Sequence, residues 1–331
     1  MHSIVKIYLI IIIPCLLFVF FMYFYPPYIS GKIENKGEFK EVNVLYAGSL
    51  LSVMEKKIGV AFQNYSGYVF RGEGHGSIQN ANMVLDKQRT PDVFIGVGDK
   101  PMEMLSNGGA AKVKWYIGFA ADELVIAYNP KSNFKNEFEK SKSGIIPWYQ
   151  ILSKPDIKFL RSDPSLDPKG CYTEIFTKLA DIFYQNSTLS SSILKEEKTD
   201  SNQIRPEEIL MTLLETGEAD AVPAYKHEAI ERGIPYILLP DQINLGSLTY
   251  EDFYKKKSCM QRDGSFVEGK PIIFNITIPT TPVKNTKGAY EFVKFLQSIK
   301  GKTILDNNGF KTTDLIYKGD SNFIPKEIVP K

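Results

Sequence analysis

The chain has 331 residues, and its 40 Lys and Arg nearly balance its 38 Asp and Glu, for a formal net charge of +2. This balance gives no reason to expect a nucleic-acid-binding protein, whose binding surface is usually strongly basic. A hydrophobic fraction of 43% argues against disorder over the whole length. The three Cys and three His are too few and too scattered for a disulfide scaffold, a zinc site or a His-rich metal site.

The beginning of the chain is strongly apolar. From Ile7 to Tyr25 no residue is charged, a run of nineteen that approaches the roughly 20 residues with which a helix crosses a bilayer. No small-residue cleavage site follows the run, which favours a retained anchor over a cleaved signal peptide. We therefore expect residues 1–29 to be a signal peptide or membrane anchor and residues 30–41 to be a polar tether. The rest of the chain would be exported, either anchored at the cell surface or secreted.

The exported part alternates short β-prone runs with helical patterns. Helical periodicity follows most of the runs, and residues 187–203 read as a polar surface loop. This alternation predicts an α/β fold with a mostly parallel sheet, in which ligands bind beyond the carboxyl ends of the strands. The β-prone runs cover residues 42–47, 68–70, 92–96, 124–128, 219–224 and 271–279.

Polar residues recur at the starts of the predicted helices. A helix N-terminus offers unpaired N–H groups and about half a unit of positive charge. Several such ends meeting in one cleft would form an oxyanion site without any cationic side chain. Taken one at a time, the same residues could be ordinary N-caps, where Ser and Asp are favoured. The positions are Gly48-Ser49, Gly76-Ser77, Asp167, Pro206-Glu207 and Tyr225-Lys226.

Several motifs follow one another in a fixed order along the exported part. They are LYAGSLLSVME, RSDPSLDPKGCY, RPEEILMTLLETGEADAVPAYKHEA, LPDQINL, GKPIIFNITIP and AYEFVKFLQSIKGKTIL. From about Val42 to Gly309 the chain thereby resembles archaeal-type molybdate/tungstate-binding proteins, the solute-binding subunits of ABC importers. The resemblance implies a type II periplasmic-binding-protein fold, with an anion between two α/β lobes. Lobe 1 would comprise residues 42–125 and 276–331, and lobe 2 residues 126–275.

The resemblance also implies which residues contact the ligand. Ser49 and Ser77 would donate hydroxyl and backbone N–H bonds to the oxyanion, and Tyr225 would be a further contact. The backbone at Lys169 is another candidate. Two carboxylates, Asp167 and Glu207, would approach the central metal atom of the oxyanion and raise its coordination from four toward six.

The two carboxylates call for a physical reason. A carboxylate beside a dianion repels it and would weaken a sulfate site. The contact becomes favourable when the carboxylate oxygen coordinates the central atom, and molybdenum and tungsten can add ligands where sulfur cannot. Asp167 and Glu207 would thus select against sulfate as well as for the metal oxyanion. The alternative is that both face solvent at helix starts.

The chain departs from the family pattern at this site. In place of D-P-C-G-Y-R it has Asp167-Pro-Lys-Gly-Cys-Tyr-Thr, so that Lys169 adds a positive charge that either strengthens anion binding or points outward. The family's Y-K-S becomes Tyr225-Lys226-His227, and the serine loop GEGHGS carries His75. These changes leave the two lobes intact but leave the identity of the ligand open.

We therefore expect a monomeric, membrane-tethered, extracytoplasmic solute-binding protein that delivers molybdate or tungstate to an ABC permease and its ATPase subunit. It would need no cofactor, perform no catalysis and bind no nucleic acid. One alternative is the same fold with sulfate or thiosulfate as ligand; another is an exported serine hydrolase using Ser77 and His75. The sequence does not choose between molybdate and tungstate, identify the permease, or decide whether Cys171 and Cys259 pair.

Overall fold

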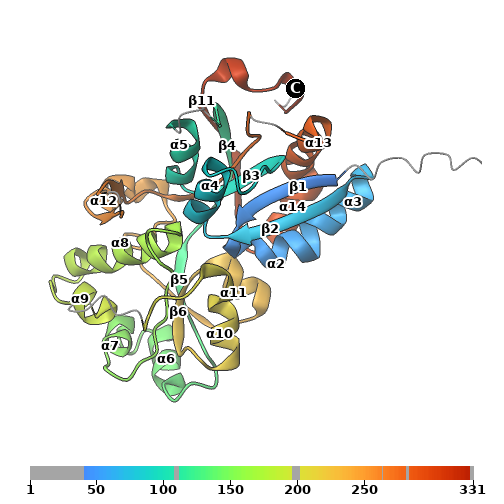
Figure 1. Ribbon diagram of the computed structural model, residues 1–331. Helices are drawn as coiled ribbons and strands as arrows, with labels where there is room; N and C mark the ends of the chain where they lie inside the picture. The colour runs from blue at the N-terminus through green and yellow to red at the C-terminus, as the bar shows by residue number, and fades with distance from the viewer. Residues whose placement is uncertain (1–40, 108–111, 196–201, 263, 281–282, 329–331) are drawn as a thin grey trace, which may run out of the picture. The chain divides into compact units, whose positions relative to one another are not determined.

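The computed structural model describes residues 41–107, 112–195, 202–262, 264–280 and 283–328. The predicted anchor at residues 1–29 lies outside this part of the chain, as does nearly all of the predicted tether. Within the described ranges, no helix combines the length and the apolar character that crossing a membrane requires. Two main sheets and a small hairpin organise residues 41–328 (Figure 1).

The larger sheet has six strands in the order β11-β4-β10-β3-β1-β2. β1, β2 and β3 are parallel to one another, whereas β10 is antiparallel to both β3 and β4, and β11 is antiparallel to β4. The prediction of a mostly parallel sheet is therefore wrong. The chain leaves this sheet through β4 and returns to it through β10, so these neighbouring strands run in opposite directions. The strands are β1 (Glu41–Ala47), β2 (Val69–His75), β3 (Val93–Val97), β4 (Trp115–Asp122), β10 (Ile272–Thr277) and β11 (Lys311–Gly319).

Helices cover both faces of the larger sheet because successive residues of a strand point to opposite sides. On β1, Tyr46 packs in one apolar cluster with Phe62 and Phe292, whereas Leu45 packs in another with Ala81 and Leu105. The result is a layered helix–sheet–helix core with strands buried on both faces. The helices are α2 (Leu51–Val53), α3 (Gly59–Ser66), α4 (Ser77–Leu85), α5 (Lys100–Asn107), α13 (Thr286–Gln297) and α14 (Ile299–Asn307).

The smaller sheet has the order β6-β5-β7, with β6 and β7 each antiparallel to β5. The chain passes from the larger sheet to the smaller one between Asp122 and Leu124, and it returns before Ile272. The lobe boundaries at 125/126 and 275/276 stay a prediction. The strands and hairpin of this half are β5 (Leu124–Tyr128), β6 (Ala221–Tyr225), β7 (Tyr236–Leu238), β8 (Ser258–Met260) and β9 (Phe266–Glu268).

Helices also surround the smaller sheet (Figure 1). One of them, α9 (Leu189–Leu194), forms inside the stretch 187–203, where the sequence predicted only a surface loop. That prediction is wrong for this segment because Leu189, Ile193 and Leu194 are buried against the neighbouring helices. The others are α6 (Lys135–Lys142), α7 (Trp148–Leu152), α8 (Pro168–Phe183), α10 (Leu210–Thr216) and α11 (Lys226–Arg232), and the short helix α12 (Glu251–Tyr254) precedes β8.

Candidate functional site

The predicted contact residues all lie at helix starts. Ser49 belongs to the 3₁₀ turn Gly48–Leu50 directly after β1, and Ser77 is the first residue of α4, directly after β2. Asp167 is the N-cap of α8 and Tyr225 is the N-cap of α11. Glu207 opens the 3₁₀ turn Glu207–Ile209, which leads into α10. The exposed fraction of these residues lies between 0% and 6%, so the structure places all of them in the interior.

Close backbone approaches join the helix starts of the larger sheet to those of the smaller one. The backbone N–H of Gln79, in the first turn of α4, donates to the Leu166 carbonyl at 3.0 Å. A Cβ atom added at Gly76 would lie 2.5 Å from that same carbonyl oxygen, and one added at Gly48 would overlap the Glu207 carboxylate. Glycine at these two positions therefore permits the contact. The two halves of the predicted site are thus in direct contact.

Among the described residues, several buried oxygen atoms at this junction have no hydrogen-bond partner. They are the Ser49 Oγ, the Tyr225 hydroxyl and the two carboxylate oxygens of Glu207, of which Oε1 has an ion-pair contact with Lys169 at 3.2 Å. A buried polar atom without a partner costs about 1–3 kcal/mol, and native proteins keep few of them. Their concentration at one place favours a polar ligand there.

Ser77 and Asp167 differ from these residues because both have partners. The Ser77 Oγ accepts a hydrogen bond from the Val97 backbone N–H at 3.1 Å, which leaves the serine O–H proton free to donate elsewhere. The Asp167 Oδ2 accepts from the Ser162 hydroxyl at 2.5 Å. Both side chains are therefore fixed before any ligand arrives.

The Lys169 side chain points inward, which is one of the two orientations that the sequence allowed. Its fully buried Nζ lies 2.9 Å and 3.0 Å from the Glu228 carboxylate oxygens and 3.2 Å from the Glu207 Oε1. The Nζ also lies 5.1 Å from the centre of the Tyr225 ring. Glu228 was missed by the sequence analysis. The sequence signal that could have found Glu228 is the capping-box spacing, in which an acidic residue follows the N-cap residue by three positions. Here the N-cap is Tyr225, and the Glu228 carboxylate accepts a hydrogen bond from the Tyr225 backbone N–H at 2.8 Å.

Burial governs the protonation of this cluster. It raises the pKa of Glu207 well above its usual range, Asp167 raises it further, and Lys169 opposes both. Burial also raises the pKa of Asp167 to about 6, against the opposing effect of Lys169. For Lys169, burial favours the neutral amine, but Glu228, Glu207 and Asp167 outweigh it and raise its pKa. The cluster therefore carries less negative charge than a count of its carboxylates suggests.

Beside the cluster, His227 links the start of α11 to the first turn after β1. Its Nδ1 lies 2.5 Å from an Asp122 carboxylate oxygen and its Nε2 lies 3.1 Å from the Ser49 carbonyl oxygen. Both partners can only accept, so both ring nitrogens have to donate and the ring is an imidazolium. His227 thus places a second buried cation beneath the Ser49 turn.

The serine-hydrolase alternative needs a base next to Ser77. The ring nitrogens of His75 instead lie 3.1 Å from Glu73 and 3.5 Å from Glu208. In the part of the chain that is described, no hydrogen bond joins His75 to Ser77. The geometry therefore gives this alternative no support.

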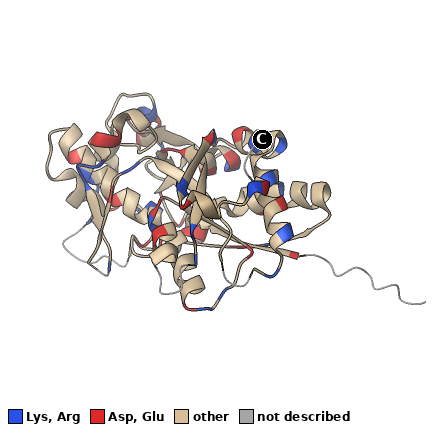
Figure 2. Cartoon of the chain, turned by 90° about the horizontal axis from the view of Figure 1, so that it is seen from above, with Lys and Arg blue, Asp and Glu red and all other residues tan. Residues whose placement is uncertain are grey.

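A cavity of about 580 Å³ opens beside the site. Its walls include Ile78, Pro168 and Tyr172, which neighbour the predicted contact residues in sequence, but not the contact residues themselves. Over the described ranges, no group of three or more His, Cys, Asp or Glu side chains is placed to hold a metal ion. Figure 2 shows basic and acidic residues interleaved along the ribbon.

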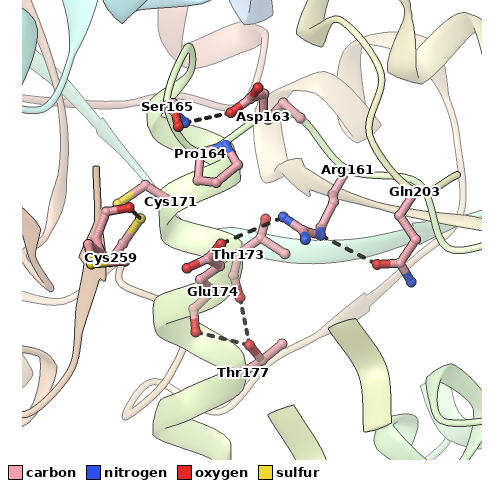
Figure 3. Close-up of polar contacts among 12 residues, drawn as sticks. Arg161, Asp163, Pro164, Ser165, Cys171, Thr173, Glu174, Thr177, Gln203 and Cys259 are labelled. Carbon is pink, nitrogen blue, oxygen red and sulfur yellow. Dashed lines mark hydrogen bonds and ion pairs between the residues drawn. The ribbon is translucent and has the colours of Figure 1, made fainter. Parts of the chain in front are cut away.

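Cys171 and Cys259 are both buried and both free, so the structure shows no disulfide between them. They lie on α8 and β8, and Figure 3 shows them side by side, near Pro164. The Gln261 side-chain nitrogen lies 3.4 Å from the Cys259 Sγ and 3.8 Å from the Cys171 Sγ. The pair packs as two small apolar side chains beside the helix that carries Lys169.

Comparison with known proteins finds solute-binding proteins. A family model described as bacterial extracellular solute-binding protein matches residues 42–311. A protein of Petrotoga mobilis named uncharacterized solute-binding protein is 35% identical over 277 residues, covering 81% of this chain and 83% of its own. The molybdate/tungstate-binding protein WtpA of Pyrococcus abyssi is 31% identical over 307 residues, covering 84% of this chain and 86% of its own.

Solved structures agree on the architecture. The periplasmic molybdate-binding protein of Azotobacter vinelandii has a TM-score of 0.56 at 15% identity, covering 82% of this chain and all of its own. The sulfate-binding protein SubI of Mycobacterium tuberculosis has a TM-score of 0.54 at 14% identity, covering 83% of this chain and 88% of its own. These likenesses show a mixed α/β fold of the periplasmic-binding-protein kind, shared by proteins named for different anions. The chain belongs to the family of bacterial extracellular solute-binding proteins.

Proposed function

We propose that this protein captures molybdate or tungstate outside the cytoplasm and delivers it to the permease and ATPase subunits of an ABC transporter. The observation that carries the proposal is the group of buried oxygens of Ser49, Glu207 and Tyr225 that have no hydrogen-bond partner among the described residues, at the place where helix starts from both sheets meet. The relatives support the choice of ligand, since one that is 31% identical is named a molybdate/tungstate-binding protein.

The oxyanion would be held mainly by hydrogen-bond donors. The first turns of the converging helices offer backbone N–H groups and the positive ends of their dipoles. Ser49 and Tyr225 would donate their hydroxyl protons, and so would Ser77, whose oxygen already accepts from Val97. The backbone at Lys169, in the first turn of α8, would add a further N–H group. Such a site holds a dianion in a protein whose net charge is close to zero.

The two carboxylates would provide the selectivity. Asp167 and Glu207 are buried, and their raised pKa values show that negative charge is costly there. A sulfate ion would bring a dianion beside both carboxylates without forming any bond to them. Molybdenum or tungsten could instead accept the carboxylate oxygens as additional ligands, as an ion carried by the protein rather than a resident cofactor.

Binding would require the two sheets to separate and close again. The contact residues are nearly inaccessible, so a ligand reaches them only when the helix starts of the two halves move apart. The chain crosses between the sheets at Asp122–Leu124 and again before Ile272, which makes these crossings the hinge. In the closed state the lobes comprising residues 42–125 with 276–331 and residues 126–275 would enclose the ion. The monomer would be attached to the membrane through residues 1–29.

Calorimetric titration of the purified protein with molybdate, tungstate, sulfate and thiosulfate tests the proposal. We expect molybdate and tungstate to bind at least about 100-fold more tightly than sulfate, a difference of about 2.7 kcal/mol. A matched Asp167→Asn/Glu207→Gln variant should lose most of this preference. Sulfate or thiosulfate affinity equal to that of tungstate in the wild-type protein would contradict the proposal. Hydrolysis of an ester or peptide that depends on Ser77 would point to an enzyme instead.

A further inference from the structure

We propose that Lys169 is a positioning residue for selectivity: anchored by Glu228, it holds the Glu207 carboxylate in the orientation that disfavours sulfate. The inference rests on the proposed function and concerns how this particular chain achieves it. It is carried by the contacts that Lys169 makes with Glu228 and Glu207.

The first step is the fixed position of the lysine itself. Its Nζ is fully buried and contacts both oxygens of Glu228, at 2.9 Å and 3.0 Å. A buried ammonium is costly unless it is paired, so the side chain cannot move away from this carboxylate cheaply. Glu228 is held in turn, because its Oε2 accepts the Tyr225 backbone N–H at 2.8 Å. Lys169 is therefore a rigid point within the site.

The second step is the contact between this rigid point and Glu207. The Lys169 Nζ lies 3.2 Å from the Glu207 Oε1, and the Glu207 Oε2 lies against the backbone of Gly48. Neither Glu207 oxygen has a hydrogen-bond partner among the described residues, and the ion pair with Lys169 is a polar contact that fixes the carboxylate. One oxygen is thereby drawn toward the lysine and the other is directed toward the turn that carries Ser49.

The third step is the effect on ligand choice. A glutamate that can rotate away would relieve its repulsion with sulfate at little cost, and the site would accept either anion. Burial raises the pKa of Glu207, but the Lys169 ammonium at 3.2 Å opposes that rise and favours the carboxylate form. A carboxylate that is held in place keeps the repulsion with sulfate and stays available to a central metal atom. Repulsion by a carboxylate can exclude sulfate only when the carboxylate cannot rotate away from the bound ion. Lys169, in the first turn of α8, holds the Glu207 carboxylate in place, and Glu228, in the first turn of α11, holds Lys169.

The experiment compares tungstate and sulfate affinities in a set of variants by calorimetry. Lys169→Met alone leaves Glu228 buried without its partner and can prevent folding. The main variant is therefore Lys169→Met/Glu228→Gln, which removes both charges. A matched control, Lys294→Met/Glu291→Gln, removes the exposed ion pair of 2.7 Å on α13. Thermal unfolding without ligand establishes that each variant folds.

We expect the control to retain the wild-type preference and Lys169→Met/Glu228→Gln to reduce the tungstate-to-sulfate affinity ratio at least about tenfold. Adding Glu207→Gln to that variant should change the ratio by less than about threefold, although Glu207→Gln alone in the wild-type protein lowers it at least about tenfold. This non-additivity is what a residue acting through Glu207 produces, and a purely structural role would not produce it.

An unchanged ratio in Lys169→Met/Glu228→Gln, or an equal effect of Glu207→Gln in both backgrounds, overturns the inference and leaves the proposed function standing. A wild-type protein that does not prefer tungstate to sulfate overturns the proposed function, and the inference with it. The two failures are therefore distinguished by the wild-type titration alone.

Discussion

The Glu207 carboxylate lies directly against the backbone of Gly48, so close that a Cβ atom at residue 48 would overlap its Oε2. Glu207 comes from the turn before α10, and Gly48 from the turn after β1. This contact joins the two halves of the candidate site. It also explains why the A-G-S segment after β1 has a glycine where the backbone φ is not positive.

Gly48→Ala should therefore displace Glu207 with little backbone strain. We expect tungstate affinity to fall at least about tenfold, while the unfolding temperature without ligand changes little. Calorimetry and thermal unfolding measure the two quantities. In a Glu207→Ala background, the same Gly48→Ala change should have almost no further effect on affinity. A large further loss there would show that residue 48 acts on something other than Glu207.

Gly76→Ala should hinder closure of the site. The added Cβ would lie 2.5 Å from the Leu166 carbonyl oxygen, and a backbone atom cannot turn aside as a flexible side chain can. We expect weaker tungstate binding and a larger radius of gyration by small-angle X-ray scattering at saturating ligand. Equal scattering curves for the wild-type and Gly76→Ala proteins with ligand would contradict this prediction.

Alanine substitutions at Ser49 and Ser77 should both weaken tungstate binding but should differ in their effect on stability. Ser77→Ala removes the acceptor of the Val97 N–H and should lower the free energy of unfolding by about 1–3 kcal/mol. Ser49→Ala removes a buried oxygen without a partner and should leave the ligand-free protein as stable or more stable. Both changes should weaken tungstate binding. Urea unfolding and calorimetry check the pair; equal stability losses in the two variants would contradict the assignment.

His227 predicts a pH dependence of stability. Burial lowers its pKa, but the Asp122 carboxylate outweighs burial, so the pKa is raised above the usual value of about 6.5. Glu228 and the Ser49 carbonyl also face the ring, and both favour the charged form. Because the folded pKa is the higher one, the stabilisation is fully present below about pH 6.5 and is lost as the pH rises through the folded pKa.

The matched variant for this prediction is His227→Gln, which cannot become charged. The difference in the free energy of unfolding between the wild-type protein and His227→Gln should shrink as the pH rises above about 6.5. Urea unfolding at a series of pH values measures it. The His227 ring also stacks on Phe310, with 3.9 Å between the ring centres. A difference that stays constant across the series would mean that His227 acts through this packing rather than through its charge.

The thiols of Cys171 and Cys259 should be unreactive in the folded protein. Burial raises the pKa of Cys171 well above its usual range, and the thiolate is the reactive form. We expect a thiol reagent to label these two residues only after unfolding, with mass spectrometry of peptides to locate the label. Rapid labelling of either residue in native buffer would show that the α8–β8 contact opens.

The sequence allowed the helix starts to be predicted because their signals are local. A short apolar run, a small polar turn and a periodic segment identify Ser49 and Ser77 without knowledge of the rest of the chain. The direction of a strand has no such signal, so the antiparallel placement of β4 and β10 was mispredicted. β4 itself was missed because Gly118, Ala120 and Ala121 give it a weak strand preference.

The orientation of the Lys169 side chain could not be predicted from the neighbouring sequence either. A lysine in the first turn of a helix is usually solvated, and only the arrival of Glu228 and Glu207 from other segments makes its burial favourable. The capping-box spacing from Tyr225 could have singled out Glu228, which the sequence analysis missed, but it would not have identified the lysine as its partner. The contact residues could thus be proposed one at a time, whereas their charge balance depends on the assembled structure.

The larger sheet is built from both ends of the exported chain, with β1 near one end and β11 near the other. The strands of the smaller sheet, in contrast, all lie between residues 124 and 238. As the chain emerges during synthesis and export, the smaller sheet can pair early, while the larger one waits for β10 and β11. The larger sheet, which carries the turns of Ser49 and Ser77 at the ends of β1 and β2, is therefore complete only when β10 and β11 are available.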